Sequence, residues 1–125
     1  MSELPDDVAR FIAEHVDNLE QLEILLLLRA QPSRDLDARE VTAELRLGPS
    51  SASERLADME ARGFLAAEGD PPRYRYAPDT AEKARVIDEL AHCYAERRVT
   101  VIIRIFSPRS DAVRSFANAF KLRRS

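Results

Sequence analysis

The stretch Leu45–Gly69, LRLGPSSASERLADMEARGFLAAEG, largely decides the fold of this chain. Its Gly48-Pro49 pair marks a break, because Gly closes a helix at low cost and Pro is tolerated at the start of a new one. After the break, small or apolar residues recur at intervals of four, three and four, which is one face of a helix: Ala52, Leu56, Met59 and Gly63. We therefore expect one helix to end before Gly48 and a second to cover residues 50–62.

The residues on either side of these two helices predict a small sheet. Residues 64–78, FLAAEGDPPRYRYAP, indicate two short strands around a Gly-Asp-Pro-Pro tip. Asp35-Leu36-Asp37 stands where a winged helix places a very short strand that pairs with this wing. Asp37 and Glu40 then have the spacing of a capping box that opens a helix from Ala38 to Arg46. The order of elements predicts a mainly α, winged helix-turn-helix fold with a small β-wing.

At these residues the chain resembles the MarR-type winged-helix transcriptional regulators, over roughly residues 19–78. The similarity lies in the Leu45-x-Leu47 turn, the run Ser50–Ser53 with Leu56, the segment Met59–Leu65 and the Arg-Tyr-Arg-Tyr return strand. The resemblance implies that the helix over residues 50–62 enters the major groove of DNA and that the wing, residues 64–77, contacts the backbone. It also implies a homodimer.

Hydroxyl and guanidinium groups make up the candidate DNA-binding surface. Serine can donate to phosphates or base edges, an arginine in a wing can neutralise a phosphate or enter the minor groove, and Glu can accept from cytosine N4. The candidate residues are Ser50, Ser51, Ser53, Glu54 and Arg55 in the helix, and Arg73 and Arg75 in the wing.

The same helix carries acids that favour a second interpretation. Glu54 and Asp58 are one turn apart, and we expect both to face the phosphates if DNA binds there. A pair of carboxylates at that position would reduce the affinity for DNA. The alternative is a winged-helix protein–protein interaction module that has lost DNA binding and uses its helix surface or its basic C-terminal tail to hold an acidic protein partner.

Further helices are expected on both sides of the winged helix. An amphipathic helix should run from Pro5-Asp6-Asp7 to about His15, and a leucine-rich scaffold helix from Leu19 to about Ala30. After the wing, a long helix should run from Thr80 towards Ser107-Pro108, followed by a short amphipathic helix from about Ser110. We expect residues 1–78 to form the winged-helix domain and residues 79–125 a dimerisation region. The predicted dimerisation residues are Ile87, Tyr94, Val101, Ile105, Phe116 and Phe120.

Composition limits the classes of function. The net charge of −3 divides into +7 over residues 97–125 and −10 over residues 1–96, so the basic tail suits nucleic acid, an acidic partner or the acidic body itself. No apolar run approaches the roughly 20 residues that span a bilayer, and the acidic N-terminus does not resemble a signal peptide. We therefore expect no membrane partner and, with one cysteine, a cytoplasmic location.

Catalytic and cofactor motifs are not evident in the sequence. It has no Gly-rich phosphate loop and no nucleophile elbow, and its histidines lack the neighbours that a metal site needs. His92 and Cys93 are adjacent on a predicted helix, so their side chains should point about 100° apart and should not form a dyad. We expect a protein without enzymatic activity and without a cofactor.

Overall fold

The computed structural model describes residues 4–106, apart from the side chains of Pro49 and Ser50. The chain forms two compact units. Glu20–Asp88 is the winged-helix unit, and the terminal unit combines residues 4–19 with residues 89–106 of the described chain. The final amphipathic helix expected from about Ser110 lies outside the described residues.

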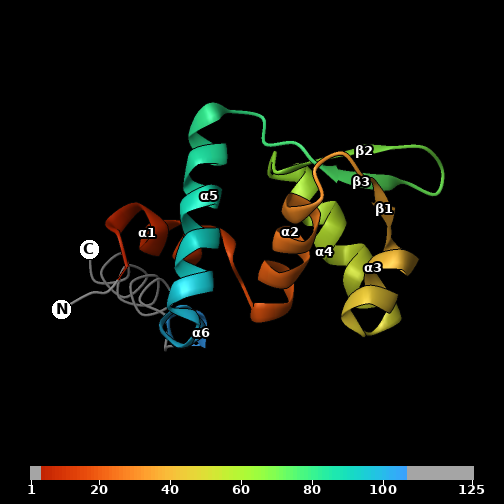
Figure 1. Ribbon diagram of the computed structural model, residues 1–125. Coiled ribbons are helices and arrows are strands. Elements are labelled where there is room, and N and C mark those ends of the chain that lie inside the picture. Colours follow the sequence, from red (N-terminus) through yellow and green to blue (C-terminus); the bar gives the residue numbers. More distant parts are fainter. Residues whose placement is uncertain (1–3, 107–125) are drawn as a thin grey trace, which may run out of the picture. The chain divides into compact units, whose positions relative to one another are not determined.

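The winged-helix unit has the predicted order of elements (Figure 1). Its three strands form an antiparallel sheet in the order β1-β3-β2, in which Leu36 pairs with Tyr74 and Ala66 with Arg75. The short strand expected at Asp35-Leu36-Asp37 is thereby confirmed. The elements are α2 (Leu19–Ala30), β1 (Leu36–Asp37), α3 (Ala38–Leu45), α4 (Pro49–Ala61), β2 (Leu65–Glu68), β3 (Arg73–Tyr76) and the first half of α5 (Ala81–Glu96).

Local signals in the sequence set the limits of α3 and α4. The capping box at the start of α3 is complete, since the Asp37 carboxylate accepts from the Glu40 N–H and the Glu40 carboxylate accepts from the Asp37 N–H. Arg46 ends α3 in the left-handed conformation, with φ 57°. Gly48 then takes the N-cap position of α4 and Pro49 follows inside the first turn, as the Gly-Pro break predicts.

The far end of α4 is attached to the start of α5. Gly63 has φ +85°, and its carbonyl accepts a hydrogen bond from the Asp79 N–H at 2.9 Å. The Lys83 Nζ donates to the carbonyl oxygen of Arg62 at 2.9 Å and forms an ion pair with Asp79 at 2.8 Å. These contacts occupy the space beside Gly63, so this position accommodates no larger side chain without displacing them.

The core of the winged-helix unit uses the faces that periodicity predicts. Leu56 and Ala52 of α4 are fully buried and Met59 is 1% exposed. The scaffold helix α2 is buried on several sides, through Leu22, Ile24, Leu25 and Leu28. The sheet and its flanks add Leu36, Phe64, Leu65 and Tyr74. Because this face of α4 is buried, only the other sides of the helix can contact a partner.

The terminal unit contains α1 (Asp6–His15), the second half of α5 and α6 (Arg98–Phe106). The long helix expected from Thr80 onward is interrupted at Arg97, whose N–H donates to the Cys93 carbonyl at 2.6 Å while its own carbonyl accepts from Val101 N–H at 3.1 Å. Neither Gly nor Pro stands at this break. Val101 and Ile105 of α6 are buried, and α6 contacts α1. Within residues 4–106, no helix combines the length and apolarity needed to cross a bilayer.

Candidate nucleic-acid interface

Helix α4 presents a small, mostly polar outward face. Ser53, Glu54 and Ala57 are exposed, on the side away from the buried Leu56. Ser53 and Glu54 are both groups that can read base edges. The structure therefore leaves two of the predicted DNA-binding residues of this helix accessible, while the side chain of Ser50 lies outside what it describes.

Two other predicted DNA-binding residues of α4 are bound to a carboxylate of α2. The Ser51 hydroxyl donates a hydrogen bond to Glu20 Oε1, and Arg55 Nε donates to the same oxygen at 2.9 Å. These hydrogen bonds, that from Ser51 first and that from Arg55 second, lower the pKa of Glu20, while partial burial opposes them. Glu20 thus occupies the donors that a phosphate would otherwise use.

The second acid of the helix is also engaged within the domain. Asp58 forms an ion pair with Arg62 at 3.0 Å and accepts a hydrogen bond from Gln21 Nε2 at 3.4 Å. Gln21 itself is only 3% exposed, so Asp58 is directed towards α2. Asp58 is thus held by α2 and by its own helix, although 44% of its side chain is exposed, whereas Glu54 is exposed without such partners among residues 4–106. That both carboxylates face the phosphates stays a prediction.

Arg73 of the wing is surrounded by acids from the start of α3. Its guanidinium lies 2.9 Å from Asp35, 3.6 Å from Asp37 and 2.9 Å from Glu40. It also donates to the Asp35 carbonyl at 3.0 Å. The pKa of Arg73 is raised, chiefly by the hydrogen bond to Asp35. This side chain joins the wing to α3 and is already neutralised.

Arg75, two residues further along β3, is in a different situation. It is exposed, and it forms no ion pair with a carboxylate of residues 4–106. Because side chains alternate along a strand, Arg75 and Arg73 lie on the same face of the sheet. Of the two predicted wing arginines, Arg75 is the one available to an outside anion.

No sequence pattern indicated which acids bind these arginines. Glu20 is 35 residues from Arg55, and Asp35 is 38 residues from Arg73. Neither pair belongs to a local motif with a fixed spacing. The contacts depend on the tertiary packing of α2 on α4 and of α3 on the wing.

The predicted dimerisation residues lie mostly inside the single chain. Ile87 and Val101 are fully buried, Ile105 is 2% exposed, and Tyr94 is half-buried with the Arg98 guanidinium 4.9 Å from its ring centre. Phe116 and Phe120 lie outside the described residues. The exposed apolar side chains of α6 are others, spaced at i, i+4 and i+7: Val99, Ile103 and Phe106. We call these three the outer α6 face.

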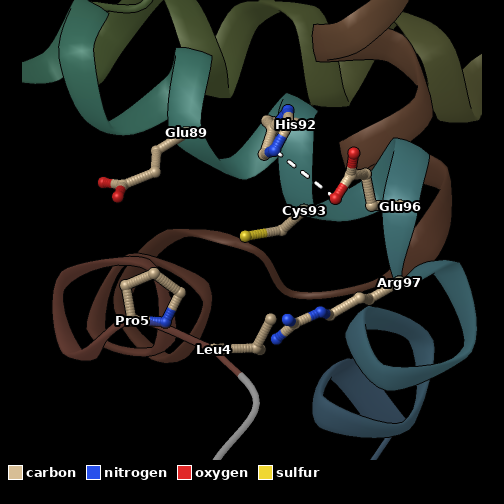
Figure 2. A pocket seen from close by; sticks show the side chains of 7 residues that line it. All are labelled: Leu4, Pro5, Glu89, His92, Cys93, Glu96 and Arg97. Atoms are coloured by element: carbon tan, nitrogen blue, oxygen red, sulfur yellow. Dashed lines mark ion pairs between the residues drawn. The ribbon is translucent and has the colours of Figure 1, made fainter.

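The terminal unit also contains a pocket of about 390 Å³ between the start of α1 and the end of α5 (Figure 2). It is lined by Leu4, Pro5, Glu89, His92, Cys93, Glu96 and Arg97. Burial, the first cause, raises the pKa of the Cys93 thiol. Figure 2 shows the His92 and Cys93 side chains leaving α5 in different directions, as their spacing predicts. Within residues 4–106, no group of three or more His, Cys, Asp or Glu side chains is placed to hold a metal ion.

The sequence matches no protein-family model, and no curated protein matches it significantly. Among solved structures, 28 chains match. The PcaV transcriptional regulator from Streptomyces coelicolor, in complex with its natural ligand, is 26% identical, and the match covers 90% of this chain and 77% of that chain with a TM-score of 0.53. Sco5413, a MarR family transcriptional regulator from the same species, is 16% identical over 93% of this chain and 79% of that chain, with a TM-score of 0.57.

A third match is a mutant of the regulator MepR from Staphylococcus aureus, bound to an oligodeoxyribonucleotide. It is 17% identical, and the match covers 91% of this chain and 83% of that chain with a TM-score of 0.54. Across about 90% of its length, this chain therefore has the fold of the MarR family transcriptional regulators. The resemblance identified in the sequence is confirmed, and so is the fold class.

Proposed function

We propose that this protein is a cytoplasmic transcriptional regulator that binds double-stranded DNA as a homodimer and has no catalytic step. Helix α4 enters the major groove, and the wing lies on the backbone. The observation that carries this proposal is the outward face of α4, where Ser53 and Glu54 stand accessible on a helix whose opposite side is fully buried. The fold supports the proposal, because a regulator with this fold, the MepR mutant, has been solved with bound DNA.

The chemistry of that face supports a direct reading of bases. A serine hydroxyl can donate a hydrogen bond to an acceptor on a base edge or accept one from a donor. A glutamate accepts from the N4 amino group of cytosine. Glu54 would then favour a cytosine at one position of each half-site. A homodimer would repeat this contact about 34–36 Å away, one turn of DNA along the operator.

The dimer itself is proposed through the region after the wing, residues 79–125. The outer α6 face supports this assignment, because Val99 is 68% exposed, Ile103 60% and Phe106 65%. Three large apolar side chains on one exposed helix face form a surface that association would remove from water. A second copy of the chain is the proposed occupant of this face.

Binding to genomic DNA fragments tests the function. Fluorescence anisotropy should detect tighter binding to at least one fragment than to a random duplex, measured between about 50 and 200 mM salt. Glu54→Lys should strengthen binding to the random duplex, since it replaces a repelled charge by an attracted one at the DNA surface. Glu14→Lys, an equal change of net charge on α1, serves as its control. Absence of binding to every duplex at 50 mM salt would refute the proposal.

A second candidate is a protein–protein interaction module without DNA binding. The observation that favours it is the neutralisation of Arg55 and Arg73 by acids of the same domain. The winged-helix unit carries 14 acidic and 10 basic residues, which makes it an unfavourable surface for a polyanion. In this case the basic tail would hold an acidic partner. Two results together would support this candidate. The protein would bind no DNA at any salt concentration, and an immobilised acidic polypeptide would retain it only while the basic tail is present.

A further inference from the structure

The basic side chains of the winged-helix unit fall into two groups. Seven of its ten form ion pairs with carboxylates of the same unit: Arg29, Arg34, Arg55, Arg62, Arg73, Lys83 and Arg85. Three arginines are exposed and have no carboxylate partner within residues 4–106: Arg39, Arg46 and Arg75. An anion that approaches this unit therefore meets these three positive charges without having to displace an acid.

Two of the three belong to α3 and its C-cap. Arg39 and Ala43 lie one turn apart on α3, Arg46 ends the helix, and all three are exposed. Val41, on the opposite side of the helix, is fully buried. Seven residues of helix separate the two guanidinium-bearing positions by about 10 Å, the axial rise of roughly three base pairs. Ala43 between them is small, so a surface can approach α3 closely. We call Arg39, Ala43 and Arg46 the α3 stripe.

The acids at and before α3 already have basic partners from outside the helix. Arg73 of the wing forms ion pairs with Asp37 and Glu40. Arg34, before β1, lies 3.4 Å from Glu44. Arg39 and Arg46, in contrast, form no ion pair with these carboxylates. The side chains of this region that remain available to an outside anion are therefore its two arginines.

The backbone at Arg46 is a second, independent indication. Arg46 has φ 57° and ψ 50°, a left-handed conformation that glycine adopts most readily. A long charged side chain at this turn does not serve the backbone, and it forms no ion pair with the carboxylates of residues 4–106. Its position is between the two helices of the helix-turn-helix, immediately before the helix proposed to enter the groove.

We propose that Arg39 and Arg46 are a phosphate-binding stripe through which α3 rests on the DNA backbone, with Arg75 as the matching contact of the wing. This inference rests on the proposed DNA-binding function. It agrees with the docking of helix-turn-helix domains, in which the first helix crosses the backbone while the second enters the groove. Arg55 and Arg73, by contrast, hold the domain together and contact no phosphate.

The test is the salt dependence of binding to a random duplex, with the full chain and four variants. Arg39→Ala and Arg46→Gly should each reduce the log–log slope by about 0.9, and the double variant by about 1.8, with all sequences weakened alike. Arg46→Gly keeps the turn, because glycine suits φ 57°, so misfolding cannot explain its effect. Arg85→Ala, which removes an exposed arginine paired with Glu82 on α5, should leave the slope unchanged.

The outcomes distinguish this inference from the function on which it rests. If the unmodified protein binds the duplex and the slope is unchanged in either α3 variant, the stripe is overturned and DNA binding stands. A loss of affinity for one sequence only would also overturn the stripe, because it would indicate a base contact. If the unmodified protein binds no duplex at 50 mM salt, both proposals are overturned.

Discussion

The Nε atom of Arg55 lies 2.9 Å from the Oε1 atom of Glu20, and this contact joins the third helix of the winged-helix unit to its first across 35 residues of sequence. The same carboxylate oxygen accepts from the Ser51 hydroxyl, one turn earlier on α4. Glu20 therefore orients two successive turns of the proposed recognition helix. The negative charge of Glu20 therefore stabilises the position of α4 on α2.

The stability of the protein should depend on pH through Glu20. The pKa of Glu20 is lowered below its ordinary value of 4.5 by the hydrogen bond from Ser51 and then by that from Arg55. The unfolded chain thus binds the proton more tightly, so the stabilisation is complete above about pH 4.5 and is lost as the pH falls through the lower folded pKa. Urea denaturation of Glu20→Gln should show a deficit at pH 7 that shrinks between pH 4.5 and 3. Glu54→Gln, on the exposed face of α4, is the matched control for the loss of one carboxylate charge.

Arg73→Ala should lower the thermal midpoint without changing the salt dependence of DNA binding. Removal of the guanidinium leaves Asp35, Asp37 and Glu40 close together without their shared counter-charge. Differential scanning fluorimetry measures the first effect and anisotropy the second. Arg75→Ala is the matched variant on the same face of β3. It should leave the thermal midpoint unchanged and reduce the salt dependence of DNA binding. A reduced slope for Arg73→Ala with an unchanged midpoint would contradict the assignment of Arg73 to the fold.

Leu56→Ala should destabilise the domain by about 2–5 kcal/mol, whereas Ser53→Ala should change its stability by less than about 0.5 kcal/mol. Leu56 is fully buried in the core of the winged-helix unit, so its truncation leaves a cavity. Ser53 is exposed on the same helix, beside the buried face. Urea denaturation at pH 7 measures both free energies of unfolding. Equal losses for the two variants would mean that the inner and outer faces of α4 had been exchanged.

Ile103→Glu should convert a dimer into a folded monomer. Ile103 is 60% exposed on the outer α6 face, so a charge there does not disturb the chain's own core but would oppose association. Light scattering at micromolar concentration should give about twice the mass of one 14.2 kDa chain before the substitution and a single chain after it. Val101→Asp, at a fully buried position of the same helix, should instead unfold the terminal unit. A monomeric mass for the unmodified protein would refute the dimer.

Gly63→Ala should destabilise the domain by about 1–2 kcal/mol or more, because the left-handed region is unfavourable for residues with a Cβ atom. At φ +85°, the added Cβ would meet the Asp79 carboxylate and lie 2.7 Å from Lys83 Nζ. Gly48→Ala is the control, since a Cβ there meets nothing within 4 Å and φ is −69°. Thermal midpoints of the two variants compare them directly, and a loss at Gly48 as large as at Gly63 would contradict this account.

Local signals were sufficient to predict most of the winged helix. The Asp37–Glu40 capping box, the Gly48-Pro49 break and the apolar spacing from Ala52 to Met59 each act within a few residues, and each element begins or ends where they indicate. The interruption at Arg97 had no such signal, because no Gly or Pro marks it. The run that follows it, residues 99–103, is β-branched, which weakens a helix without defining where it ends.

The site was less predictable than the fold, because its charges are decided by tertiary partners. Arg55 and Arg73 suggested phosphate contacts by residue type, and nothing near them in the sequence revealed Glu20 or Asp35. The orientation of α6 was ambiguous for a different reason. Apolar residues stand on both of its sides, so periodicity could not decide whether Val101 or Ile103 faces the core.

Helix α4 is attached at its two ends to different helices. Glu20 of α2 binds Ser51 and Arg55 near its beginning, and Lys83 of α5 binds the Arg62 carbonyl just after its end. Helix α4 also packs on α3 and β2. A ligand that shifted α2 or α5 would therefore act on one end of α4 through these hydrogen bonds, without contacting α4 itself.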